Sequence, residues 1–343
     1  MVDLRSDTLT RPTEAMRRVM ATAEVGDDVF GEDPTVIRLQ ETVAERLGKE
    51  AALFVSSGVM GNQLAIKVQT RPGDEVICEA GCHISNYESA ASAALWGVQL
   101  RTVEGRRGIL TAGQVEAAIR PGHYWEPQPR VVALENTHNK AGGVVQPPEH
   151  VAGIARVARD HGLRFHLDGA RIWNASIASG IPERELVAPF DTVSVCLSKG
   201  LGAPVGSLLV GPADLIREAR RFRKMLGGGM RQVGILAAAG LHALEHHRDD
   251  LAKDHERARR LAEGLASIPA FELDPTLVET NIIMFDVRDA TAEEVVRKLA
   301  AEGVRMVPFG PRTIRATTHR DLTDLNIDQA LSVLDRLFRN GAH

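Results

Sequence analysis

The chain has 343 residues, 44% of them hydrophobic and 25% charged, a composition typical of a folded globular protein. Its formal net charge of -4 gives no electrostatic reason to expect nucleic acid or an anionic membrane as a partner. Three cysteines (Cys78, Cys82 and Cys196) argue against a disulfide framework, and the first residues lack the apolar run of a signal peptide, so we expect a cytoplasmic protein.

Over the first 210 residues, short apolar runs alternate with stretches of helical periodicity. A helix is predicted over 34–47, where Pro34 follows Asp33, and further helical segments over 58–68, 114–119 and 149–161. The predicted strands are 51–55, 75–79, 99–103, 130–135, 163–168, 192–197 and 207–210. This alternation predicts an α/β domain with a largely parallel sheet that is covered by helices on both faces.

The character of the sequence changes near residue 212. A long helical stretch runs to about residue 266, with one interruption at the three glycines 227–229. The C-terminal part then predicts a small α+β unit, with strands over 280–287 and 313–316 and helices over 292–302 and 325–339. We therefore expect a large domain over residues 1–250, whose N-terminal segment contributes to the active site, and a small domain over 251–343.

The strand over 163–168 carries a candidate functional carboxylate. His166 and Asp168 lie on one face of this strand, and Asp168 stands at its C-terminal end, where open α/β sheets bind ligands. Asp168 could stabilise a protonated ring nitrogen, or it could only cap the helix that follows.

The next strand ends in Ser198-Lys199-Gly200. A lysine at the tip of a buried strand either reaches solvent or serves as a nucleophilic amine, because desolvation makes the amine reactive towards an aldehyde. Asp168 lies at the end of the preceding strand. Together, Asp168 and Lys199 favour a ligand with a pyridine ring, whose nitrogen would face Asp168 and whose aldehyde carbon would react with Lys199.

Two further segments fit such a ligand. Gly58 and Val59 follow a strand and open a helix, so their backbone N–H groups suit a phosphate. His83 follows another strand, where an imidazole could stack on a flat ring or could be only structural. His242 and His246 have helical spacing without a carboxylate, and Cys78 and Cys82 have no second pair, so no metal site is expected.

Several motifs in order along the chain resemble one family, the low-specificity L-threonine aldolases, which are pyridoxal-phosphate (PLP) enzymes of the aspartate-aminotransferase fold (fold type I). The motifs occupy residues 3–8, 26–35, 50–55, 135–139, 166–171, 197–200 and 225–232. The resemblance implies a sheet of the seven-stranded type that lies between layers of helices. It also implies cleavage of L-threonine, L-allo-threonine and other β-hydroxy-α-amino acids to glycine and an aldehyde.

The resemblance also implies a role for each matching residue. The cofactor would be held by Gly58, Val59, His83, Asp168, Arg171 and Lys199, with Lys224 and Arg231 reaching the phosphate from a neighbouring subunit of a homotetramer. Lys199, His83 and His123 would be the catalytic residues, and His83 or His123 or a water between them would take the hydroxyl proton. Ser6, Arg171 and Arg315 would bind the substrate carboxylate, because an arginine fork suits a carboxylate.

Two positions depart from the family pattern, and other functions remain open. Phe30 and Val59 stand where the family often has tyrosine and threonine, which puts the substrate side-chain preference in doubt. The alternatives are a β-eliminating PLP lyase of the same fold, an aldolase for bulky phenylserine-type substrates, and a non-catalytic binding protein.

Overall fold

A seven-stranded sheet lies at the centre of the computed structural model, which describes residues 1–339. Neighbouring pairs among β7, β6, β5, β3 and β4 are parallel, whereas β8 runs antiparallel to both of its neighbours. The strands in spatial order are β2 (Ala51–Val55), β8 (Ser207–Gly211), β7 (Thr192–Cys196), β6 (Arg164–Gly169), β5 (Gln128–Glu135), β3 (Asp74–Glu79) and β4 (Gln99–Val103).

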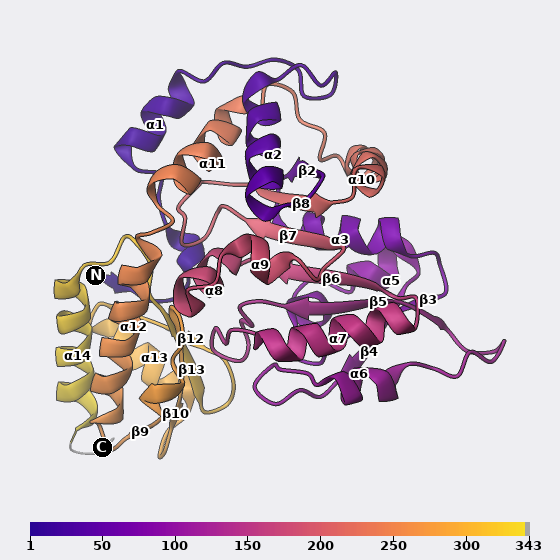
Figure 1. The fold of residues 1–343 in the computed structure, drawn as a ribbon. Helices are drawn as coiled ribbons and strands as arrows, with labels where there is room; N and C mark the ends of the chain where they lie inside the picture. The colour runs from indigo at the N-terminus through magenta and orange to yellow at the C-terminus, as the bar shows by residue number, and fades with distance from the viewer. Residues whose placement is uncertain (340–343) are drawn as a thin grey trace.

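Helices cover both faces of this sheet, each with its own apolar core (Figure 1). The larger core lies under α1 (Glu14–Ala21), α2 (Pro34–Leu47), α6 (Ala112–Ala118), α7 (Pro148–Asp160), α8 (Ile172–Ser179), α9 (Glu183–Val187) and α11 (Gly234–His246). The opposite face is covered by α3 (Gly58–Gln69), α4 (His83–Asn86), α5 (Ala91–Trp96) and α10 (Ala213–Met225). The predicted α/β class is therefore confirmed.

A second core lies in the C-terminal part, where a four-stranded antiparallel sheet packs against three helices. The sheet consists of β12 (Val307–Pro308), β13 (Thr313–Thr317), β10 (Ile282–Val287) and β9 (Phe271–Glu272), and the helices are α12 (Leu251–Ala266), α13 (Ala292–Ala301) and α14 (Asp324–Phe338). The division into domains at residue 250 stays a prediction.

The N-terminal segment belongs to this second core, which the sequence did not indicate. Strand β1 (Val2–Asp3) pairs in parallel with β11 (Val304–Arg305), and Val2 and Leu4 are fully buried there. Two short 3-10 helices, Asp7–Leu9 and Pro275–Leu277, complete the described elements. The segment then crosses to the large sheet, so it links the two cores.

Most predicted bounds agree with the structure to within two residues, because local chemistry sets them. For α2, Asp33 accepts hydrogen bonds from the N–H groups of Thr35 and Val36, and Gly48 ends the helix at a φ of 63°. The prediction of one long helical stretch from residue 212 to 266 with a single interruption was wrong in one respect. The chain also turns at 247–250, between α11 and α12. There His247 Nδ1 bonds to the Leu201 carbonyl, 2.8 Å away, instead of continuing α11.

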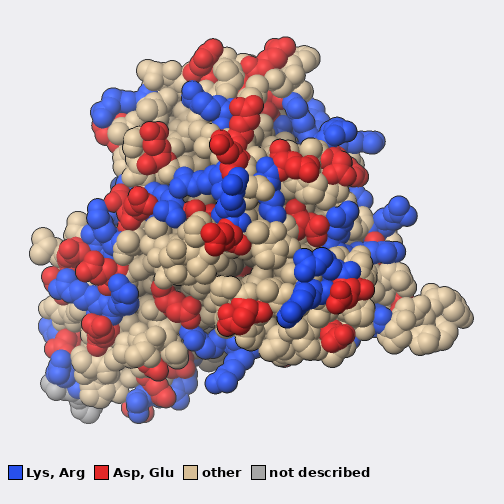
Figure 2. All heavy atoms as spheres, viewed as in Figure 1, with Lys and Arg blue, Asp and Glu red and all other residues tan. Residues whose placement is uncertain are grey.

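The charged side chains and the lengths of the helices can be followed along the described chain. On the face drawn in Figure 2, Lys and Arg side chains are interspersed with Asp and Glu side chains. Within residues 1–339, every helix is too short or too polar to cross a bilayer.

Asp254 is a buried acid on α12. Its side chain is almost fully buried, and its Oδ1 has no hydrogen-bond partner within residues 1–339, although Arg257 Nη1 lies 3.7 Å away. Burial raises the pKa of Asp254 to about 7, against the lowering effect of Arg257. The folded protein therefore favours the neutral acid.

The Asp254→Asn variant should be more stable than the wild type at about pH 8 by about 2 °C or more in Tm. The folded-state pKa lies above the unfolded value of 3.8, so the stability that Asp254 contributes at low pH is lost as pH rises towards 7. The gain should shrink at about pH 5. Calorimetry at both pH values checks this, with Asp249→Asn as the exposed control, and an equal gain at both values would contradict it.

Candidate active site

Five segments meet at one edge of the large sheet. The parallel strands β3, β5, β6 and β7 all end at this edge, and β2 leads there into the first turn of α3. Since the carboxyl ends of parallel strands face the same side, the residues that follow them are brought together. The edge therefore carries Lys199, Asp168, His83 and Gly58, four of the residues predicted from the sequence.

Lys199 lies in the turn after β7 and is half-buried. Its Nζ donates to Cys196 Sγ at 3.5 Å. Its carbonyl oxygen accepts hydrogen bonds from Thr10 Oγ1 at 2.8 Å and from the N–H of Gly202 at 2.9 Å. The backbone of the lysine is thus fixed while its amine stays at the base of the site.

The first turn of α3 forms a cradle for an anion. Ser57 caps the helix by accepting from the Met60 N–H at 3.2 Å, while the N–H groups of Gly58 and Val59 have no partner among the described residues. A Cβ at Gly58 would lie 2.8 Å from Cys196 Sγ, so only glycine fits against this wall. Free N–H groups beside the lysine turn fit a phosphate.

Asp168 is buried and held by two hydrogen bonds. Its Oδ2 accepts from Asn62 Nδ2 at 2.8 Å, and its Oδ1 accepts from the Ala170 N–H at 3.1 Å. The alternative role as a cap of the next helix does not hold, because α8 begins after Arg171 without a side-chain cap. A buried carboxylate at this place fits a protonated ring nitrogen.

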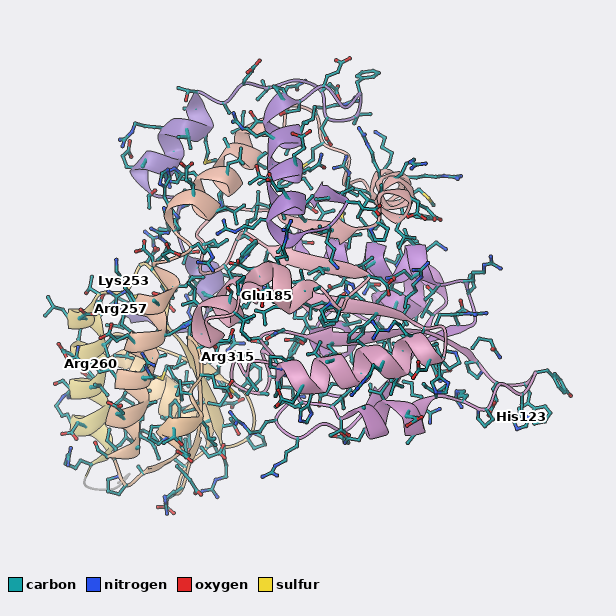
Figure 3. All side chains as sticks on the ribbon, viewed as in Figure 1. His123, Glu185, Lys253, Arg257, Arg260 and Arg315 are labelled. Atoms are coloured by element: carbon teal, nitrogen blue, oxygen red, sulfur yellow. The ribbon has the colours of Figure 1, made fainter. Side chains whose placement is uncertain are left out.

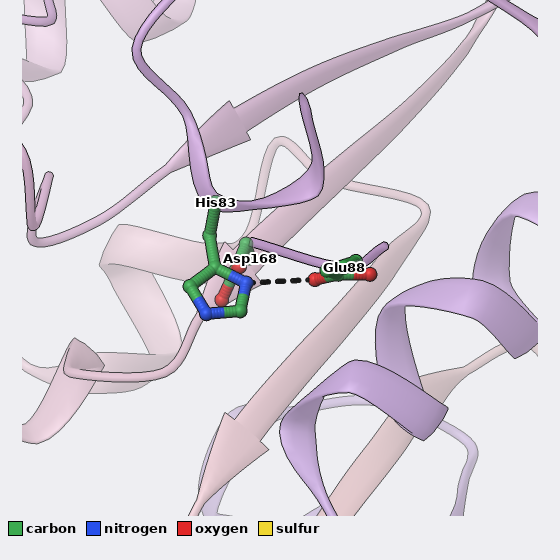
Figure 4. Close-up of side chains that lie close together, drawn as sticks. All are labelled: His83, Glu88 and Asp168. Carbon is green, nitrogen blue, oxygen red and sulfur yellow. Dashed lines mark hydrogen bonds and ion pairs between the residues drawn. The ribbon is translucent and has the colours of Figure 1, made fainter. Parts of the chain in front are cut away.

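His83 stands beside Asp168 and pairs with a residue that the sequence did not single out (Figure 4). Its Nδ1 lies 2.9 Å from Glu88 Oε1, and its backbone N–H donates to Glu135 Oε2 at 2.6 Å. The pKa of His83 is raised, because the nearby carboxylates of Glu88 and Asp168 outweigh the effect of burial.

The two arginines predicted to bind the substrate carboxylate are held differently. Arg171 donates through Nε and Nη2 to the two oxygens of Asp7, each at 2.8 Å, and both side chains are buried. The charge of Arg171 holds the pKa of Asp7 at about 2 in spite of burial. Arg315 donates to Asn139 Oδ1 at 3.0 Å, while its buried Nε has no hydrogen-bond partner among the described residues.

Ser6 lies next to this pair but bonds locally. Its Oγ lies 2.7 Å from Thr8 Oγ1 and accepts from the Thr8 N–H, capping the first 3-10 helix. An exposed hydroxyl of this kind remains accessible to a ligand.

Three predicted residues lie on exposed parts of the chain. His123 lies on an exposed loop, stacked on Trp125 at 4.7 Å between ring centroids, and Figure 3 shows it far from Arg315. Lys224 and Arg231 lie on exposed segments, and Arg231 pairs with Asp27 at 3.1 Å. Phe30, one of the two departures from the family pattern, is exposed as well.

Sequence reasoning missed the residues that support the site. Asn62, Glu88 and Glu135 are buried and bond to Asp168 or His83, and Asp7 orients Arg171. Asn62 lies one helical turn after Gly58, and Asp7 lies next to Ser6. The positions of Asn62 and Asp7 beside predicted site residues could have indicated their roles. The sequence around Glu88 contains no comparable signal.

Comparison with known proteins agrees with this geometry. Residues 3–290 match the model of a family described as beta-eliminating lyases. The chain is 45% identical to a probable low-specificity L-threonine aldolase of Arabidopsis thaliana, over 99% of this chain and 98% of that one. It is 40% identical to a low specificity L-threonine aldolase of Escherichia coli, over 94% and 95%.

A solved structure of a Leishmania major threonine aldolase superimposes with a TM-score of 0.84 at 20% identity, covering 98% of this chain and 99% of that one, so it has the same fold. The match to the lyase family model covers most of the chain, and the relatives match along nearly their full length. The chain therefore belongs to the low-specificity L-threonine aldolases, as the motifs predicted.

Proposed function

We propose that this chain is a PLP-dependent aldehyde-lyase that cleaves L-threonine and L-allo-threonine, and other β-hydroxy-α-amino acids, to glycine and an aldehyde. One observation carries the proposal: Asp168 lies at the end of β6 and Lys199 follows the adjacent parallel strand β7, beside the free N–H groups of α3. The family supports the same reaction, since the named relatives are threonine aldolases.

When bound, the cofactor supplies an aldehyde that holds the substrate amino group and an electron-poor ring that accepts the electrons of the breaking Cα–Cβ bond. Lys199 would hold its aldehyde carbon and Asp168 its ring nitrogen. The N–H groups of Gly58 and Val59 would hold its phosphate, and His83 would cover the ring.

The remaining residues bind and orient the substrate. Arg315, with the Nη1 group that Asp7 leaves free on Arg171, would hold the carboxylate, and the Ser6 hydroxyl would add a hydrogen bond. A clamped carboxylate fixes the direction of the Cα–Cβ bond relative to the ring. The hydroxyl proton passes to a nearby base, the aldehyde leaves, and Cα takes up a proton to give glycine.

We propose further that the enzyme is a cytoplasmic homotetramer whose sites are shared between two chains. Lys224 and Arg231 are exposed cations beside the three glycines 227–229, and an exposed position suits a contribution to a neighbouring site. The free, buried state of all three cysteines supports a reducing compartment.

The substrate test compares products. With L-threonine, the protein should release glycine and acetaldehyde, and serine or cysteine should give no pyruvate. Borohydride should trap the cofactor on Lys199, and Lys199→Ala should lose both the adduct and the cleavage. Pyruvate as the main product would favour the β-eliminating alternative, and a coloured protein inert to every β-hydroxy amino acid would favour a binding role.

Gly58→Ala should weaken cofactor binding by about tenfold or more, because the new methyl group meets Cys196 Sγ at 2.8 Å and shifts the phosphate cradle. A cofactor titration followed by absorbance measures this. Gly113→Ala is the matched control, because that position has open space around it. Equal affinity in the two variants would remove the phosphate assignment.

Shared sites predict complementation between inactive variants. Lys199→Ala and Arg231→Ala should each be almost inactive alone, but a mixed assembly contains sites with both residues intact. Random pairing should restore roughly a quarter of the wild-type rate. Co-expression with two different tags and purification on both tags tests this, and a mixture no more active than its parents would show that Arg231 serves its own chain or neither.

A further inference from the structure

Glu88 is a buried carboxylate that the proposed reaction does not use. It lies between α4 and α5, its side chain is fully buried, and three donors surround it. Asn62 Nδ2 donates to its Oε1 at 2.8 Å, Gln63 Nε2 donates to its Oε2 at 2.6 Å, and His83 Nδ1 lies 2.9 Å from its Oε1. Donors of this number stabilise an ionised carboxylate.

The direction of the hydrogen bonds at Asn62 follows from the carboxylates beside it. Glu88 Oε1 and Asp168 Oδ2 both lie 2.8 Å from the same end of the amide, and an ionised carboxylate only accepts, so this end is Nδ2. Asn62 Oδ1 then faces His166 Nε2, 3.2 Å away on the other side.

This orientation turns the amide group of Asn62 towards both carboxylates. Asn62 Nδ2 donates to Asp168 Oδ2 and to Glu88 Oε1, each at 2.8 Å. One amide therefore connects the carboxylate assigned to the cofactor ring with the carboxylate that holds His83. Because an ionised carboxylate only accepts hydrogen bonds, the His83 nitrogen that faces Glu88 must carry a proton.

We propose that Glu88 is a positioning residue that keeps His83 cationic, with Nδ1–H bound to Glu88 and Nε2–H directed to the cofactor and substrate side. Under the proposed function, on which this inference rests, His83 then offers the reacting groups a proton and a positive charge. A neutral His83 held in the same way would offer a lone pair at Nε2 instead.

The surroundings of His83 agree with a cation. The carboxylates of Glu88, Asp168 and Glu135 face it from the loop after α4, from β6 and from β5, and together they raise the pKa of His83 although burial opposes them. The Tyr87 ring is its aromatic neighbour, at 5.5 Å between centroids. One polar atom from each of His83, Glu88 and Asp168 lies within 4.8 Å of the other two, close enough for strong coupling (Figure 4).

The test measures the titration of His83 itself. Hydrogen–deuterium exchange at histidine Cε1, read by mass spectrometry on the cofactor-loaded full-length protein, gives the pKa of each imidazole. Wild-type His83 should titrate above the ordinary 6.5, and in Glu88→Gln it should titrate at least about one pH unit lower. Glu88→Asp keeps the charge and should stay nearer to the wild type.

A matched control comes from a second buried pair. Glu79 Oε2 lies 2.8 Å from His138 Nε2, so Glu79→Gln removes a comparable carboxylate–histidine contact. It should lower the pKa of His138 and leave that of His83 in place. In Glu88→Gln the alkaline limb of kcat/KM for threonine should move to lower pH by the same amount as the pKa of His83, which a loss of packing alone would not produce.

The titration of His83 decides whether Glu88 keeps this histidine cationic. An unchanged His83 titration in folded Glu88→Gln overturns the proposal. If that variant does not fold, the wild type still decides, because titration of His83 at or below 6.5 overturns it as well. Since the exchange experiment needs no turnover, a protein that fails to cleave threonine would contradict the proposed function without affecting this result.

Discussion

The buried ion pair between Asp7 and Arg171 is the contact on which the arrangement of the site depends. Both side chains are withdrawn from water, and the bidentate geometry of their contact offsets the cost of burying the two charges. Asn281 Nδ2, from the start of the C-terminal sheet, donates to Asp7 Oδ2 at 3.1 Å. One carboxylate thus joins the N-terminal segment, the end of β6 and the second core.

The same N-terminal segment fixes the lysine turn. Three residues after Asp7, Thr10 Oγ1 donates to the carbonyl of Lys199, and three residues before it, the Leu4 carbonyl accepts from the Thr317 N–H near Arg315. Breaking a buried pair by removing one partner costs on the order of 3–5 kcal/mol, because the other charge is left uncompensated. The position of Arg315 relative to Lys199 therefore depends on the hydrogen bonds of the N-terminal segment.

The sequence predicted the sheet and the residues at its edge well, because both have local signals. Apolar runs of strand length gave β5, β6 and β7, and Lys199 and Asp168 could be recognised by their places at strand ends. The pairing of β1 with β11 could not be predicted, because the two strands are two residues long and lie at opposite ends of the chain. Such a pairing is determined by tertiary packing, not by local propensity.

The supporting residues were hidden for a different reason. Glu88 lies in an irregular loop, and its effect on His83 exists only because α3 brings Asn62 and Gln63 to the same place. The spacing of Asn62 from Gly58 indicated its position, but not the two carboxylates that its side chain binds. A hydrogen-bond network of this kind is a property of three dimensions, whereas the strand-end rule that found Asp168 is a property of the sequence pattern.

The charge around the phosphate cradle links the site to assembly. Two backbone N–H groups at a helix start offset only part of a phosphate dianion. Arg223 lies near this turn, but its guanidinium already donates to the Phe54 carbonyl and to Asp28 Oδ2, so it is committed to the fold. Arg231 is exposed, and within residues 1–339 its guanidinium pairs with Asp27. We therefore propose that Arg231 of a neighbouring subunit supplies the remaining positive charge, in which case cofactor affinity would depend on oligomerisation.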